Sequence, residues 1–140
     1  MEKISEIEII TICGSMAFAK EMLEIKEKLE KKGYEVIVPA RTEEYAIGNI
    51  KVESKWEKQE LDVIRDYFKK IGESDAILLV NKTKNGIENY IGGNSLIEMA
   101  FAHVQDKKIY LLNPIPIMCY SDEIEAMKPK VLNGNLEDRL

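Results

Sequence analysis

The apolar run from Ala76 to Val80 limits the possible folds of this chain more than any other stretch. Five consecutive apolar residues stand between the polar residues Asp75 and Asn81. A run without alternating polar positions is typical of a strand covered on both faces, as in the centre of a parallel sheet. Such a sheet needs a layer of helices on each face. The run therefore favours a layered α/β architecture.

The rest of the sequence alternates between strand and helix patterns. Further strands are predicted over residues 7–13, 34–38 and 107–113, with a short fifth strand over 129–132. Helices are predicted over residues 16–32, 54–72, 93–105 and 121–127. This order predicts a three-layer α/β domain, in which right-handed crossovers join four to five parallel strands and helices cover both faces.

Two details of this prediction concern the segment between the second and third strands. Residues 40–51 show no clear period and are expected to form a loop, which either lies over a binding site or is a plain connection. The helix over 54–72 begins with a possible capping box, Ser54 to Glu57. Its expected core stripe consists of Leu61, Ile64, Phe68 and Ile71.

The composition fits a single domain spanning residues 1–140. Hydrophobic residues make up 45% of the chain, which is enough for a core. The net charge is −5, and 20 basic residues are interleaved with 25 acidic ones, which argues against nucleic acid or an anionic membrane as a partner. The sequence has no signal-peptide pattern and no run near the roughly 20 apolar residues of a membrane span, so we expect a cytoplasmic protein.

In parallel α/β sheets, ligands bind beyond the carboxyl ends of the strands. This rule brings together Gly14-Ser15-Met16 after the first strand and Asn81 after the central one. The Gly-Ser turn could bind phosphate or sugar through backbone N–H groups and a hydroxyl, or it could simply cap a helix. It lacks the spacing of the dinucleotide and Walker fingerprints, so neither nicotinamide nor ATP is indicated, and we expect no cofactor.

A second glycine turn, Gly92-Gly93-Asn94, opens directly into an apolar helix that carries Glu98. Adjacent glycines allow a ligand to approach the backbone, and the N-terminus of the helix favours an anion. An ionised carboxylate there is a candidate nucleophile. Alternatively, Ser95 and Glu98 form a capping box and only satisfy backbone donors.

Other chemistry-bearing residues give weaker signals. Asp62 and Asp66 are one helical turn apart, which suits either a solvated ion-pair face or one aspartate that reaches the cleft. The single histidine, His103, has no Ser or Cys partner of the triad type. No group of residues has metal-ligand spacing, so no metal is expected.

Several short motifs, in this order and spacing, resemble the nucleoside 2-deoxyribosyltransferase superfamily. The likeness covers roughly residues 7 to 113 and is carried by Ile12-Cys13-Gly14-Ser15 with Phe18, Leu29, Gly33-Tyr34-Glu35-Val36 with Pro39, Asp66 before Ser74-Asp75-Ala76, Gly92-Gly93 before Glu98-Met99-Ala100, and Lys108-Ile109-Tyr110. The resemblance implies a flavodoxin-like (Rossmann-like) parallel sheet.

The resemblance also implies cleavage of the N-glycosidic bond of a nucleoside or nucleotide. A glutamate at the position of Glu98 would attack C1′ of the sugar, and an aspartate at the position of Asp66 would assist departure of the base. A second base or water would then accept the sugar. We expect the substrate to be bound by Gly14, Ser15, Met16, Phe18, Asn81, Gly92, Gly93 and Asn94. The family also implies a homodimer or higher oligomer.

This sequence departs from the family's nucleotide-hydrolase branch in its first loop. Ser15-Met16-Ala17-Phe18 contains no arginine for a 5′-phosphate. One alternative is a non-catalytic nucleotide-binding module, in which Glu98 contacts a ribose hydroxyl. A weaker similarity, Gly92-Gly93 before a glutamate, is to cytokinin-activating-type nucleotide phosphoribohydrolases, whose glycine-rich motif is incomplete here.

Overall fold

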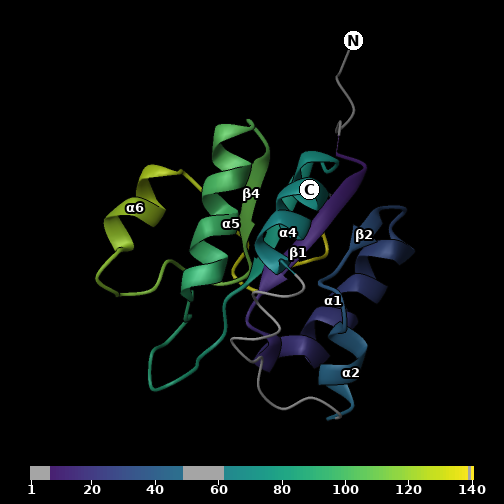
Figure 1. Cartoon of the computed structure of the whole chain (residues 1–140), viewed down its shortest axis with the longest axis horizontal. Helices are drawn as coiled ribbons and strands as arrows, with labels where there is room; N and C mark the ends of the chain where they lie inside the picture. Colours follow the sequence, from purple (N-terminus) through teal and green to yellow (C-terminus); the bar gives the residue numbers. More distant parts are fainter. Residues whose placement is uncertain (1–6, 49–61, 139) are drawn as a thin grey trace.

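The computed structural model describes residues 7–48, 62–138 and 140, and it contains a five-stranded sheet (Figure 1). All neighbouring strands are parallel, and their order is β2-β1-β3-β4-β5. The strands are β1 (Ile9–Gly14), β2 (Glu35–Ile37), β3 (Ala76–Val80), β4 (Lys108–Leu111) and β5 (Lys130–Val131). This is the flavodoxin-like strand order. The predicted three-layer α/β fold is therefore confirmed, with the Ala76–Val80 run as its central strand.

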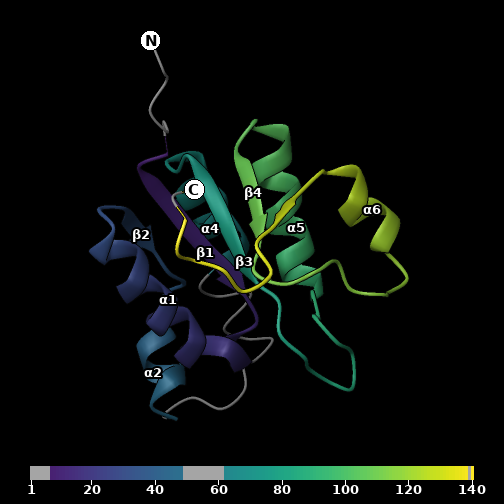
Figure 2. The same cartoon turned by 180° about the vertical axis from the view of Figure 1, so that it is seen from behind.

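Helices cover both faces of the sheet. They are α1 (Ala19–Lys31), which follows a short 3-10 turn η1 (Met16–Phe18), α2 (Thr42–Ala46), α4 (Val63–Gly72), α5 (Gly93–Val104) and α6 (Ser121–Ala126). Helices α4 and α5 lie against one face (Figure 1). Helix α1 and the C-terminal segment lie on the opposite face, where the segment is drawn in yellow (Figure 2).

The residues of β3 alternate between two hydrophobic cores. Leu78 and Val80 pack with the α1 side, whereas Ile77 and Leu79 pack with α4 and α5. All five residues of the strand are fully buried. Side chains of a strand point alternately to the two faces of its sheet, so a strand between two helical layers must be apolar at every position.

The segment between β2 and β3 differs from the prediction. Residues 42–46 form the short helix α2 within the expected loop. Helix α4 begins at Val63 after the N-cap Asp62, whose side chain accepts a hydrogen bond from the backbone N–H of Arg65 at 3.3 Å. The predicted helix start at Ser54 and the stripe residue Leu61 lie outside the described residues.

The predicted core stripe of α4 is wrong at two positions. Ile64 and Phe68 are 43% and 44% exposed, whereas Tyr67 is buried beside Ile71. Tyr67 can be buried because its hydroxyl donates a hydrogen bond to the carbonyl oxygen of Ile12 in β1. The helix is therefore rotated so that Ile64 faces a cavity described below.

Candidate functional site

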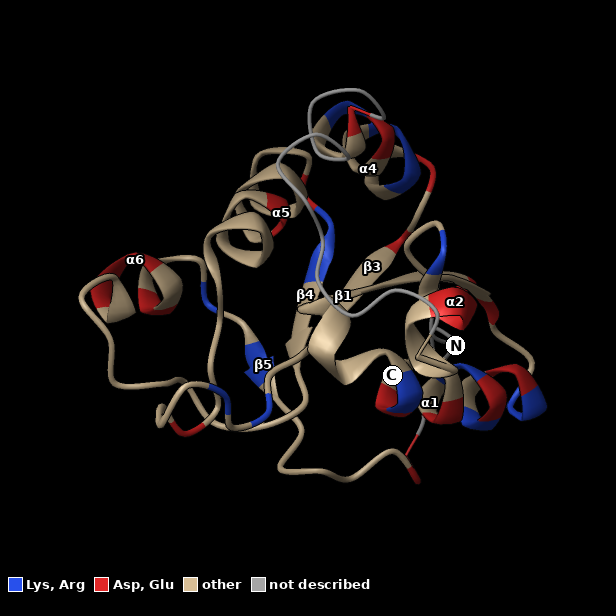
Figure 3. Ribbon diagram, turned by 60° about the horizontal axis from the view of Figure 1, so that its bottom comes forward, with Lys and Arg blue, Asp and Glu red and all other residues tan. Residues whose placement is uncertain are grey.

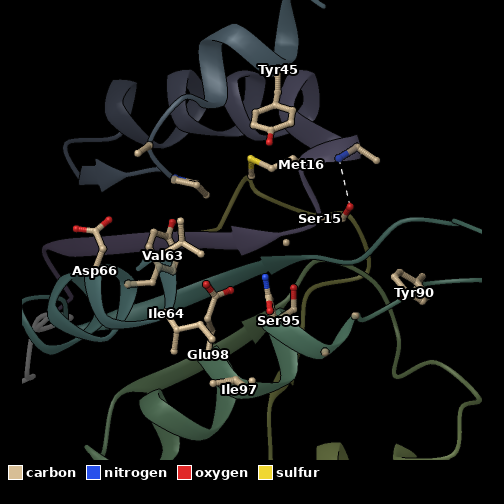
Figure 4. A pocket seen from close by; sticks show the side chains of 18 of the residues that line it. Ser15, Met16, Tyr45, Val63, Ile64, Asp66, Tyr90, Ser95, Ile97 and Glu98 are labelled. Carbon is tan, nitrogen blue, oxygen red and sulfur yellow. Dashed lines mark hydrogen bonds between the residues drawn. The ribbon is translucent and has the colours of Figure 1, made fainter. Parts of the chain in front are cut away.

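A cavity of about 640 Å³ opens at the carboxyl edge of the sheet, beyond Gly14 at the end of β1 (Figure 4). Its walls come from the turn after β1, the segment after β2, helices α4 and α5, and the loop between β3 and α5. The site is where strand order reverses, with β2 on one side of β1 and β3 on the other. This is the expected ligand position in such a fold, and the volume suits a small molecule.

Most of the sequence-predicted site residues line this cavity. They are Gly14, Ser15, Met16, Asp66, Gly92, Gly93, Asn94 and Glu98. Segments as far apart in sequence as the first strand and α5 therefore contribute to one site. Phe18 and Asn81 are the exceptions.

Glu98 projects into the cavity from α5 and is partly buried (Figure 4). The capping-box interpretation of this residue is wrong because α5 begins at Gly93 and its N-cap is Gly92. Ser95 lies inside the helix and is buried. The side chain of Glu98 therefore does not cap the helix, and it lines the cavity instead.

Glu98 contacts Cys13 on the side of its carboxylate that faces the protein interior. The Cys13 side chain is fully buried, and its thiol forms a hydrogen bond with the Glu98 carboxylate. Burial raises the pKa of Cys13 well above its usual range, and the charge of Glu98 and this hydrogen bond raise it further. Cys13 is therefore a neutral thiol at physiological pH, able to donate its S–H.

Asp66 combines both roles that the sequence left open. It lies in the first turn of α4 and lines the cavity, but its carboxylate also forms an ion pair with Lys70 at 2.9 Å. In the view of Figure 4, Val63 and Ile64 lie between Asp66 and Glu98.

Tyr67 lies close to both acids, Glu98 and Asp66. Burial raises the pKa of Tyr67 well above its usual range, and nearby Cys13, Glu98 and Asp66 raise it further. The phenol is therefore neutral and keeps its hydrogen bond to the Ile12 carbonyl. This bond fixes α4 to the end of β1, next to Cys13.

The Gly14-Ser15 turn brings the backbone close to its neighbours. Gly14 has φ +147°, and a Cβ atom there would lie 2.8 Å from Met22 Cε and 2.9 Å from the Val80 oxygen. Only glycine suits this position. The Ser15 hydroxyl accepts a hydrogen bond from the N–H of Ala17 at 3.2 Å, so the predicted capping role is also present.

Lys84 is a site residue that the sequence prediction missed. Its Nζ donates a hydrogen bond to Ser15 Oγ at 2.8 Å, drawn as a dashed line in Figure 4, and lies 5.6 Å from the centre of the Tyr90 ring. Both residues line the cavity, as does Tyr45 of α2. Lys84 stands in a polar loop in which no periodic pattern distinguishes one lysine from another. It places a cation beside the Gly-Ser turn.

Asn81, which was predicted to bind the substrate, does not line the cavity. This side chain is fully buried, and its Nδ2 donates to the carbonyl oxygens of Asn113 at 2.8 Å and Pro114 at 3.1 Å. Its Oδ1 accepts from the N–H of Asn113 at 2.9 Å, and Asn113 Nδ2 donates to the Asn81 carbonyl oxygen at 2.9 Å. Asn81 instead joins the ends of β3 and β4.

Phe18 is likewise a structural residue. It is buried at the end of the 3-10 turn before α1 and belongs to the core on that face of the sheet. The direction of its side chain follows from the turn, which the motif alone does not reveal. Phe18, which was predicted to contact the substrate, does not line the cavity.

The charges of the cavity wall are mixed. Among the described residues of the wall, Asp66 and Glu98 are acidic, Lys84 is basic, and the others are apolar or neutral. Lysine and arginine also alternate with acidic residues along α1 and α4 (Figure 3). Within the described residues, no group of three His, Cys, Asp or Glu side chains could hold a metal ion. In the same part of the chain, no helix has the length and apolar character needed to cross a membrane.

Comparison with known proteins gives no further guide to the chemistry. Neither a family model nor a curated protein matches the sequence.

Proposed function

We propose that this protein cleaves or transfers the N-glycosidic bond of a (deoxy)nucleoside or nucleotide, with Glu98 as the nucleophile. The observation that carries the proposal is the position of Glu98, which projects from α5 into a cavity large enough for a nucleoside at the carboxyl edge of the sheet. The sequence resemblance supplies the reaction class.

The cavity wall suits the two parts of such a substrate. In Figure 4, Glu98 lies between Val63, Ile64 and Asp66 on one side and Ser15 with Tyr90 on the other. An apolar wall with one carboxylate can bind a planar base and contact its nitrogen atoms. The hydroxyl of Ser15 and the ammonium of Lys84 offer hydrogen-bond donors to the 5′ end of the sugar.

The proposed reaction has two steps. A Glu98 oxygen attacks C1′, an ester bond forms, and the electron pair of the C1′–N bond leaves with the base. Asp66 assists the departure of the base, whose nitrogen takes up a proton as the C1′–N bond breaks. The nitrogen of a second base, or water, then attacks C1′ and releases Glu98, as in retaining glycosidases.

We further propose that the protein is a cytoplasmic homodimer or higher oligomer. Ile64, Phe68 and Ile97 on α4 and α5 are exposed large apolar side chains, and Phe68 packs edge-on against Phe101 at a ring-centre distance of 5.1 Å. An exposed apolar surface of this kind favours association. Light scattering coupled to size-exclusion chromatography measures the mass directly, and a monomer at micromolar concentration contradicts the oligomer.

The test of the function is incubation of the pure protein with purine and pyrimidine (deoxy)nucleosides and their 5′-monophosphates, with and without a free base. Base release or exchange is expected from the wild type. Glu98→Gln, which keeps the shape of the side chain, is expected to abolish turnover and to retain ligand binding. Binding without turnover in the wild type would instead support the non-catalytic nucleotide-binding module.

A further inference from the structure

The hydrogen bond between Cys13 and Glu98 involves a buried group that the reaction scheme does not use. Cys13 is the penultimate residue of β1, and its side chain lies on the face of the sheet covered by α4 and α5. It is fully buried and is absent from the cavity wall, whereas Glu98 lines that wall. The thiol therefore meets the carboxylate from the protein side, opposite the place of a substrate.

We propose that Cys13 is a positioning residue for Glu98, holding one carboxylate oxygen from the protein side so that the other faces the cavity. This inference rests on the proposed function. A glutamate side chain has three rotatable bonds, and one donor at its end removes much of that freedom. The attacking oxygen is then in place before the substrate arrives.

The position of Cys13 is itself fixed. Its backbone is paired with Leu79 inside the parallel sheet between β1 and β3. The preceding carbonyl, of Ile12, accepts the hydrogen bond of the buried Tyr67 hydroxyl. On the other side, Gly14 packs tightly against the Val80 backbone. A donor on so rigid a strand is suited to orienting a longer and more flexible side chain.

The thiol has a function in both steps of the reaction. In the first step it orients the carboxylate for attack on C1′. In the second step the ester becomes a carboxylate again as the C1′–O bond breaks, and a neutral S–H donor stabilises the returning negative charge. The raised pKa of Cys13 suits this role, because burial keeps the thiol protonated and able to donate in both steps.

The first test compares Cys13→Ser with Cys13→Ala. Both replacements are slightly smaller than cysteine, but only serine keeps a donor. We expect Cys13→Ala to lower kcat by about tenfold to a hundredfold, the range for a hydrogen bond to a charged group, with KM little changed. Cys13→Ser should recover most of this loss. Equal kcat values for the two variants would overturn the positioning role.

The second test detects the contact without turnover. The chain has two cysteines, and Cys119 is exposed. In a Cys119→Ser background, the infrared S–H stretching band therefore reports Cys13 alone. We expect a band shifted to low frequency by the carboxylate, which moves upward when Glu98→Gln is added. An S–H band at the same frequency with and without Glu98→Gln would disprove the contact.

The two tests separate this inference from the proposed function. If the wild type turns over no nucleoside or nucleotide, the reaction class fails and with it the catalytic role of Cys13. The infrared band then still decides whether the thiol holds the Glu98 carboxylate. A shifted band together with a Cys13→Ala variant as active as Cys13→Ser would confirm the contact and refute its effect on the reaction.

Discussion

Replacing Asn81 by alanine distinguishes a structural residue from a ligand-binding one. Three hydrogen bonds of its buried side chain would be lost, two to the carbonyl oxygens of Asn113 and Pro114 and one from the Asn113 N–H. At about 1 kcal/mol net for each bond, the free energy of unfolding should fall by about 3 kcal/mol. With an unfolding entropy of about 0.3 kcal/mol per kelvin for a chain of this length, Tm should fall by about 10 °C.

The matched control for this experiment is Asn113→Ala. It removes one side-chain hydrogen bond, from Asn113 Nδ2 to the Asn81 carbonyl oxygen, so we expect a loss of only about 1 kcal/mol. Urea unfolding followed by circular dichroism measures both values. If Asn81→Ala weakens nucleotide binding while its unfolding free energy stays within experimental error of the wild type, the structural role is refuted.

Three further predictions concern the cavity and the amino edge of the sheet. Gly14→Ala should lower the unfolding free energy by about 1–3 kcal/mol because of backbone strain and close contacts. Gly93→Ala meets open space, so it should raise the unfolding free energy by about 0.4–1 kcal/mol while weakening ligand binding. Equal effects of the two substitutions in urea unfolding would contradict this prediction. Asp75 accepts hydrogen bonds from the N–H groups of Ile9 and Glu8, which lower its pKa. Its contribution to stability should therefore be complete at neutral pH and decline as the pH falls below the ordinary carboxyl pKa of about 3.9. The difference in unfolding free energy between wild type and Asp75→Asn should become smaller below that pH. A difference that stays constant with pH would argue against this role of Asp75. Lys84→Met should reduce kcat/KM more for nucleoside 5′-monophosphates than for nucleosides. The control is Lys82→Met, which removes a lysine paired with Glu21 at 3.7 Å and should affect both substrate classes equally. An equal loss for both classes in the Lys84 variant would exclude a contact between Lys84 and the phosphate.

The sheet was predictable because the apolar pattern of its central strand indicates burial on both faces. Residues 76–80 are apolar at every position, and only a strand between two layers requires this. Helix α2 was missed because a helix of five residues, with only Thr42 and Ala46 buried, has no measurable stripe.

The rotation of α4 could not be predicted for a different reason. A period of 3.6 residues permits either Ile64 and Phe68 or Tyr67 on the core face, and hydrophobicity favours the first choice. The buried partner of the Tyr67 hydroxyl, the Ile12 carbonyl, lies in another element. Hydropathy does not contain that information.

The location of the site was predictable, but not its complete wall. The carboxyl-edge rule and the glycine turns lead to Gly14 and Gly93, both of which line the cavity. The same rule also selected Asn81, because position in the sequence does not tell which way a side chain points. Lys84 was missed because its contact with Ser15 joins two loops that are far apart in the chain.

Mass spectrometry of a trapped intermediate tests the nucleophilic role of Glu98 most directly. A nucleoside with fluorine at C2′ of the sugar should form the glycosyl ester and hydrolyse slowly, because fluorine destabilises the positively charged transition state. We expect the intact protein to gain the mass of one sugar, and the peptide containing Glu98 to carry it. A sugar on another residue, or full turnover by Glu98→Gln with no adduct in the wild type, would contradict the proposed chemistry.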